Sequence, residues 1–295
     1  MDIATMKIYI FLFGLLFNWL LPAQTDTEVF LFNLSFNGER YSLSKPQNIS
    51  NNKGYDNQPH FSNDGQFLLY AGTIGEQTDI FQYELSSGKK TQLTNTSGSE
   101  YSPTPTPDGK GFSCIILEKD GTQLLYRYDW GSNDPQVLIP GLVVGYHVWL
   151  SKKKIVSFVL GDPNYLQWNI VGSKRRGMIQ SNIGRALHKI PGTSSLSFVD
   201  KSKGSGNWQL RSWQRGRKSK LICNTLNKVE DLAWTPAGDI LMGKNDRLYQ
   251  LLIGEESARR QVADLSLYGL SGITRIAVSP NGRAIAIVVE EKKVP

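Results

Sequence analysis

The sequence predicts an all-β fold, a six-bladed β-propeller built from four-stranded antiparallel blades. Short apolar runs separated by turn residues recur along nearly the whole chain of 295 residues. Equivalent first-strand positions follow one another at intervals of 44, 44, 41, 44 and 44 residues, at Pro59, Pro103, His147, His188, Leu232 and Ile276. Repeats of this length are typical of propeller blades. An N-terminal segment that resembles the missing half of the last repeat predicts that the ring closes.

Each repeat carries the same four expected strands, and the first repeat shows them most clearly. Residues 57–62 form the first strand, and Asn63-Asp64-Gly65 reverses the chain because these residue types accept tight-turn conformations. The run "FLLYAG" is apolar on both faces, as a strand buried on both sides requires. "DIFQYEL" and "KKTQLT" then supply the third strand and a polar outer strand.

The sixth repeat is incomplete at the C-terminus. "TRIAVSPNGRAIAIVVE" supplies two strands, whereas "EVFLFNLSFNGERY" near the N-terminus matches "DIFQYELSSGKKTQ" of the first repeat. We therefore expect residues 28–50 to complete the blade formed by 271–291. Such a closure removes the open sheet edge that would otherwise invite aggregation.

The first 23 residues predict a cleaved signal peptide. Lys7 precedes an apolar run, Ile8–Leu21, that is shorter than the roughly 20 residues of a membrane span, and a small residue, Ala23, follows. An uncleaved anchor is the alternative. Cleavage would leave 24–295 as a single propeller domain without an integral membrane span, periplasmic or secreted from a bacterium. No cysteine near the cleavage site supports a lipoprotein anchor.

Charge and cysteine content restrict the function classes. The net charge is +7, with basic clusters at 173–177, 211–220 and 258–260. Since exported proteins rarely meet nucleic acid, we expect a solvated outer face or an anionic envelope partner, and no nucleic acid. Cys114 and Cys223 fall on different repeats, which favours two buried apolar side chains over a disulfide. The absence of a Cys-x-x-Cys pair gives zinc no support.

Four phrases carry a family resemblance: "PHFSNDGQFLLY", "PTPTPDGKGF", "AWTPAGDILM" and "AVSPNGRAIAI". They resemble the WD-like repeat of TolB-type six-bladed propellers, which places a Ser-Pro-Asp-Gly-like turn between its first two strands. The resemblance covers roughly residues 28–290 and is weakest in the third and fourth repeats. It implies the propeller fold and a role in an envelope complex. The N-terminal α/β domain of TolB is not expected, because few residues separate the signal from the first strand.

The three histidines are candidates for a site in the central channel. His147 and His188 occupy equivalent positions on successive first strands, and His60 lies near the same position of the first repeat. Packed, hydrogen-bonded side chains are the favoured interpretation, and a shared ligand or metal is the alternative. We expect neither a metal nor another cofactor.

Charged residues gather near the starts of the first strands and predict a polar channel mouth. The tentative binding residues at this mouth, with the histidines included, are Asp56, His60, Glu100, Tyr101, His147, His188, Asp231 and Arg275.

The sequence favours binding over catalysis. Gly204-Ser205-Gly206 is not a nucleophile elbow, and no catalytic residue is predicted. We expect a non-catalytic, monomeric module that binds a protein or peptide in the bacterial cell envelope. One alternative is a carbohydrate-binding or carbohydrate-cleaving enzyme with its site in the channel, using Asp56, Glu100, Asp231, His147 or His188. Another is a structural accessory of an envelope or secretion complex.

Overall fold

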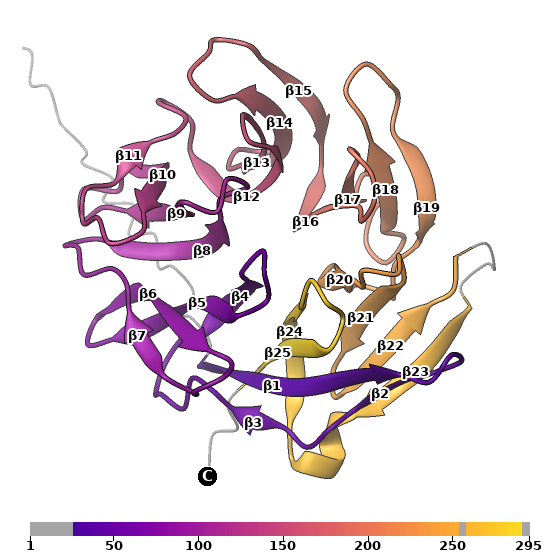
Figure 1. The fold of residues 1–295 in the computed structure, drawn as a ribbon. Helices are drawn as coiled ribbons and strands as arrows, with labels where there is room; N and C mark the ends of the chain where they lie inside the picture. The colour runs from indigo at the N-terminus through magenta and orange to yellow at the C-terminus, as the bar shows by residue number, and fades with distance from the viewer. Residues whose placement is uncertain (1–25, 254–257, 291–295) are drawn as a thin grey trace, which may run out of the picture.

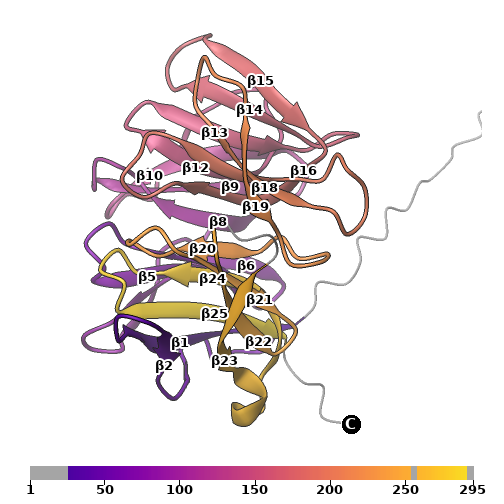
Figure 2. The ribbon, with the colours of Figure 1, turned by 90° about the vertical axis from the view of Figure 1, so that its right-hand side faces the viewer.

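The computed structural model describes residues 26–253 and 258–290, and it confirms the predicted six-bladed propeller. Six antiparallel sheets stand around a central axis, each with its first strand innermost (Figure 1). Seen from the side, the ring forms a short cylinder (Figure 2). The predicted signal peptide, 1–23, lies outside the described residues.

The first three blades each contain four strands in chain order. Blade one is β4 (Asn57–Phe61), β5 (Phe67–Ile74), β6 (Gln77–Glu84) and β7 (Lys90–Gln92). Blade two is β8 (Ser99–Pro105), β9 (Gly111–Leu117), β10 (Gln123–Asp129) and β11 (Gln136–Val137). Blade three is β12 (Val144–Ser151), β13 (Lys154–Val159), β14 (Tyr165–Ile170) and β15 (Arg176–Ser181).

Blades four and five follow the same order, whereas blade six joins strands from both ends of the described chain. Blade four is β16 (Ile183–Lys189), β17 (Leu196–Asp200), β18 (Gln209–Trp213) and β19 (Lys220–Asn224). Blade five is β20 (Leu232–Trp234), β21 (Ile240–Lys244), β22 (Arg247–Leu251) and β23 (Arg259–Asp264), and a 3₁₀ turn, η1 (Leu265–Tyr268), follows. Blade six joins β24 (Ser271–Val278) and β25 (Ala284–Glu290) to β1 (Thr27–Phe36), β2 (Tyr41–Leu43) and β3 (Gln47–Asn48).

The N-terminal strands close the ring, as the sequence predicts. β1 lies antiparallel to β25, with seven residue pairs that run from Thr27 opposite Glu290 to Asn33 opposite Ala284. In Figure 1 the indigo β1 lies against the yellow β25. β2 and β3 both pair with β1 on its other side. The edge of β25 is therefore covered by a strand that lies more than 240 residues away in the sequence.

The third and fourth blades are regular, although their repeats are the least clear in the sequence. Five residues, 106–110, connect β8 to β9, whereas only Lys152 and Lys153 connect β12 to β13. The difference of three residues equals the shortening of that repeat from 44 to 41. Neither lysine has a positive φ angle, so this connection does not need a glycine.

The core consists of six apolar clusters, one between each pair of neighbouring blades. The second strand of each blade serves two of them because its side chains alternate between faces. In β5, Leu68 packs toward blade six and its neighbour Leu69 packs toward blade two. This double burial is why every second strand reads as a continuous apolar run. Cys114 and Cys223 are free thiols on different blades.

Candidate functional site

The six first strands surround a central channel that is wide at one end and narrow at the other. The wide mouth, about 610 Å³, is formed where the first strands end and turn into the second strands. The narrow chamber, about 110 Å³, lies closer to the starts of the first strands. The two spaces share lining residues from several blades, among them Pro59, His60, Thr104, His188 and Ile276.

An ion-pair cluster from three blades bounds the narrow chamber. Asp231, just before β20, accepts hydrogen bonds from the guanidinium groups of two arginines. Arg185 of β16 approaches it at 2.7 Å through Nη2, and Arg275 of β24 at 2.8 Å through Nη1. Hydrogen bonds between ionised partners are stronger than neutral ones. This carboxylate therefore holds blades four, five and six together at the channel.

Glu230 extends the cluster away from the channel. Its carboxylate accepts the backbone N–H of Arg185 at 2.7 Å and lies 3.0 Å from Nζ of Lys201. Burial lowers the pKa of Arg185, but the ion pair with Asp231 outweighs it and holds the pKa above its ordinary value. Three cations and two carboxylates leave the cluster with one net positive charge, which favours an anionic or carbonyl-bearing ligand.

Three tyrosines from the other half of the ring lie near the two arginines. The Tyr146 hydroxyl accepts a hydrogen bond from Arg275 Nη2 at 3.1 Å, and the guanidinium lies 5.5 Å from the tyrosine ring centre. Tyr55 packs edge-to-face on Tyr101, with ring centres 6.2 Å apart. Burial raises the pKa of Tyr55, and the charges of Arg275 and Arg185 oppose that rise.

We call the following six residues, which lie at the narrow end of the channel, the arginine–tyrosine mouth: Tyr55, Tyr101, Tyr146, Arg185, Asp231 and Arg275. Tyr101, Asp231 and Arg275 were predicted for the channel mouth, whereas Tyr55 and Tyr146 were not. The missed signal is positional: Tyr101, Tyr146 and Arg185 are each the third residue of a first strand, and Arg275 is the fifth residue of its own.

The predicted histidines lie in or beside the channel. His147 is buried, and its Nε2 lies 2.6 Å from Ser113 Oγ, which also accepts a hydrogen bond from the Trp149 indole. Burial lowers the pKa of His147 to about 3 and that of His188 to about 4, and nearby His60 adds to both shifts. Both rings are therefore neutral at pH 7.

Among residues 26–253 and 258–290, no group of three or more His, Cys, Asp or Glu side chains is arranged to hold a metal ion.

Three of the predicted mouth residues, Asp56, Glu100 and Tyr101, line neither space of the channel. Asp56 is 1% exposed and Glu100 is fully buried, and neither lines the narrow chamber or the wide mouth. The Thr96 hydroxyl donates a hydrogen bond to Glu100. Burial raises the pKa of Asp56 to about 7 and that of Glu100 to about 8. Of the predicted carboxylates, only Asp231 therefore lines the channel, because side chains at the start of a first strand can also point between blades.

Comparison with known proteins supports the resemblance seen in the repeats. A 58-residue segment is 38% identical to the Tol-Pal system protein TolB of Francisella tularensis, over 20% of this chain and 13% of that protein. A putative TolB structure from Agrobacterium tumefaciens superposes with a TM-score of 0.69 at 14% identity, covering 92% of this chain and all of that one. The chain folds as a TolB-like six-bladed β-propeller.

Further solved structures share the propeller fold. TolB from Acinetobacter baumannii matches with a TM-score of 0.56 at 14% identity, over 91% of this chain and 64% of that one. An oligogalacturonate lyase in complex with manganese matches with a TM-score of 0.58 at 12% identity, over 90% of this chain and 86% of that one. No family model matches the chain. At these identities the structural matches show the fold alone.

Within the described residues, no helix is long and apolar enough to cross a membrane.

Proposed function

We propose that this TolB-like propeller is an exported, non-catalytic module that binds a protein or peptide in the bacterial cell envelope. The observation that carries the proposal is the arginine–tyrosine mouth. Arg185 and Arg275 share one carboxylate, so guanidinium N–H groups and one positive charge remain for a ligand. Phenolic hydroxyls beside them suit backbone carbonyls and acidic side chains, because the mouth then offers donors already held in place.

Two further considerations support this function. The partial identity to a Tol-Pal system protein favours an envelope partner. The predicted signal peptide, 1–23, favours a periplasmic or secreted protein of residues 24–295. Because β1 covers the edge of β25, we also propose that the module works as a monomer.

The test compares the wild-type protein with mouth variants in cross-linked capture from native envelope extract. Arg275→Gln removes the charge while keeping a polar side chain, and Arg283→Gln makes the same change at an exposed site outside the channel. We expect one envelope protein with wild type and Arg283→Gln, and at least tenfold less with Arg275→Gln. The dissociation constant of the purified partner should rise by the same factor.

If Arg275→Gln melts at the wild-type temperature and captures the same protein equally well, the mouth is not the contact surface. Arg275→Lys separates charge from geometry, since lysine cannot reproduce the bonds from one guanidinium to Asp231 and Tyr146.

Carbohydrate recognition or cleavage in the channel is a second candidate function. It is favoured by the likeness to an oligogalacturonate lyase and by the channel, which has a space of about 610 Å³ at one end and a space of about 110 Å³ at the other. In the same capture experiment, enrichment of glycan fragments without a protein partner would support it. An assay for glycan cleavage with wild type and Asp231→Asn would then distinguish turnover from binding.

A further inference from the structure

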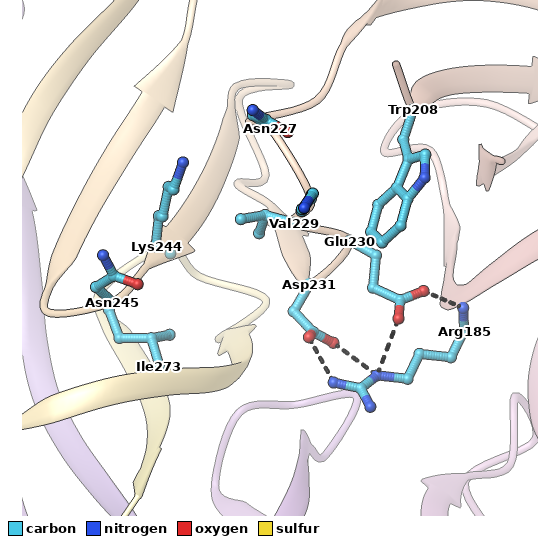
Figure 3. Close-up of a pocket in the computed structure, with 11 residues that line it drawn as sticks. Arg185, Trp208, Asn227, Val229, Glu230, Asp231, Lys244, Asn245 and Ile273 are labelled. Atoms are coloured by element: carbon cyan, nitrogen blue, oxygen red, sulfur yellow. Dashed lines mark hydrogen bonds and ion pairs between the residues drawn. The ribbon is translucent and has the colours of Figure 1, made fainter. Parts of the chain in front are cut away.

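A second hollow lies between blades four and five, beside the channel, with which it shares Arg185 and Asp231. Its volume is about 460 Å³, and Figure 3 shows Trp208 on one side with Lys244 and Asn245 on the other. An adjoining hollow of about 320 Å³ shares Asn227, Lys244 and Asn245 with it. Both volumes fall in the range of about 300–1,000 Å³ that is usual for ligand pockets. We call the combined surface of Trp208, Asn227, Lys228, Lys244 and Asn245 the blade four–five groove.

The groove presents unneutralised positive charge. The carboxylates near the groove already form ion pairs. Glu230 pairs with Arg185 and Lys201, Asp231 pairs with Arg185, and Asp246 lies 4.0 Å from Arg247. By contrast, Lys228 and Lys244 have no carboxylate within 4.0 Å in the described part of the chain. A cleft lined by one sign of free charge attracts ligands of the other sign.

The neutral side chains of the groove have the chemistry of a sugar site. Trp208 is half-buried, and Lys201 Nζ lies 4.0 Å from its ring centre. Asn227 and Asn245 are exposed, and each amide offers both donors and an acceptor. A pyranose ring has a flat face of C–H groups that packs on an aromatic ring, and its hydroxyls match amide groups in both hydrogen-bonding senses.

The backbone of the groove is held in an unusual conformation at two lining residues. Lys228 has a φ angle of 59° and Asn245 one of 56°. The left-handed region is uncommon for residues other than glycine, and for lysine it carries a cost in conformational energy. Such conformations cluster at binding sites, where the surrounding structure maintains them. In this groove, the two left-handed residues, Lys228 and Asn245, both have polar side chains and both line the hollow.

We propose that the blade four–five groove binds an acidic oligosaccharide, with a sugar ring against Trp208 and carboxylates near Lys228 and Lys244. An acidic peptide would satisfy the cations as well. A peptide has no sugar ring to pack on the indole of Trp208 and fewer hydroxyl groups to pair with the amides of Asn227 and Asn245. An acidic saccharide can therefore contact more of the residues that line the groove. The hollow shares Arg185 and Asp231 with the arginine–tyrosine mouth, but none of the five groove residues lines the channel. Lys244→Gln therefore tests the groove, whereas Arg275→Gln tests the mouth.

The test is calorimetric titration of residues 24–295 with tetragalacturonic acid at low salt. The fully methyl-esterified tetramer removes the charges, and tetraglutamate supplies carboxylates without sugar rings. We expect binding to the acid that weakens as salt rises, and at least tenfold weaker binding to the other two ligands. Lys244→Gln should weaken binding of the acid about tenfold, as loss of a charge-assisted hydrogen bond does. Trp208→Leu should weaken it at least as much.

The matched control is Lys152→Gln, the same change at an exposed lysine in the β12–β13 connection, which should bind within twofold of wild type. Lack of binding to tetragalacturonic acid would overturn the proposal, as would equal loss in the control. Tighter binding of tetraglutamate would assign the groove to an acidic peptide instead. If Trp208→Leu does not fold, Lys244→Gln still decides the outcome.

Discussion

Glu100 is a carboxyl group that the fold keeps protonated at neutral pH. It is fully buried at the interface of blades one and two, and burial raises its pKa from 4.5 to about 8, with the nearby Asp79 carboxylate adding to the rise. The folded state thus binds a proton that the unfolded chain has released above pH 4.5. Its contribution to stability is fully present below that pH and is lost as pH rises through about 8. Asp56, with a pKa of about 7, acts in the same direction.

The Glu100→Gln variant tests this linkage. Wild-type unfolding free energy should fall between pH 5 and pH 8, by up to about 1.4 kcal/mol per pH unit for each of the two groups. Glutamine keeps an acceptor for the Thr96 hydroxyl and cannot ionise, so the variant should be more stable than wild type at pH 8 and show a shallower pH dependence. Urea denaturation at several pH values measures both effects. An unchanged pH profile would mean that Glu100 ionises freely.

Some of the charged residues predicted for the channel mouth line the channel, and others are buried between blades. Asp231 and Arg275 could be placed at the channel mouth because the repeat fixes the start of each first strand. Asp56 and Glu100 hold comparable positions in the sequence but are buried. Side-chain direction in that segment depends on bulges in the first strands of blades one and two, between Asn57 and His60 and between Tyr101 and Thr104. A one-residue bulge reverses which side chains face the channel, and its position is not encoded in a simple pattern.

At the scale of the element, β1 is the strand on which ring closure depends. Phe32 is 1% exposed and packs with Leu241 and Ile285 between blades five and six. Phe36, on the same strand, is 50% exposed and contacts Tyr41. The two phenylalanines therefore differ in burial while sharing residue type and strand.

Phe32→Ala should destabilise the propeller by about 3–5 kcal/mol, because it removes buried apolar surface and leaves a cavity. Phe36→Ala is the matched control and should cost no more than about 1 kcal/mol. Urea denaturation midpoints at pH 6 compare the two variants directly. Equal, small losses would show that β1 contributes little to the interface with blade five.

Turn chemistry explains why some elements were clearer in the sequence than others. In five blades the first turn contains a glycine with positive φ, at Gly65, Gly109, Gly192, Gly238 and Gly282, so the sequence marks these turns. The β12–β13 connection has neither a glycine nor a positive φ angle, so its sequence carries no such mark. The blade itself is still fixed by packing, since Ile155 and Val156 fill the clusters on its two sides.

At the scale of the molecule, periodicity determines the fold far more completely than the site. A repeat of about 44 residues specifies strand order, core face and ring closure together, because every blade must bury the same two faces. The arginine–tyrosine mouth and the blade four–five groove combine residues from different blades. Their distances depend on how blades are tilted and on which side chains turn inward, and neither is periodic. The fold was therefore predictable, and the clustering of these residues was not.

Removal of residues 24–48 from the mature chain tests closure in the whole ring. The truncation would uncover the backbone of β25 over Ala284–Glu290 and the apolar side chains that β1 covers. An open edge of this kind pairs with other chains. We expect concentration-dependent association and a lower melting temperature, measured by analytical ultracentrifugation and calorimetry.

A synthetic peptide of residues 27–48 should reverse this association when it is added in trans. The peptide carries β1, β2 and β3, and it can restore the seven residue pairs with β25 and the apolar contacts of Val29 and Phe32. The same peptide with Val29→Asp is the control, because Val29 is fully buried and an aspartate there would leave a charge without a partner. A truncated protein that stays monomeric and melts at the wild-type temperature would show that blade six is stable with two strands. If the native peptide restores the monomer and the Val29→Asp peptide does not, the pairing of β1 with β25 is what keeps the ring closed.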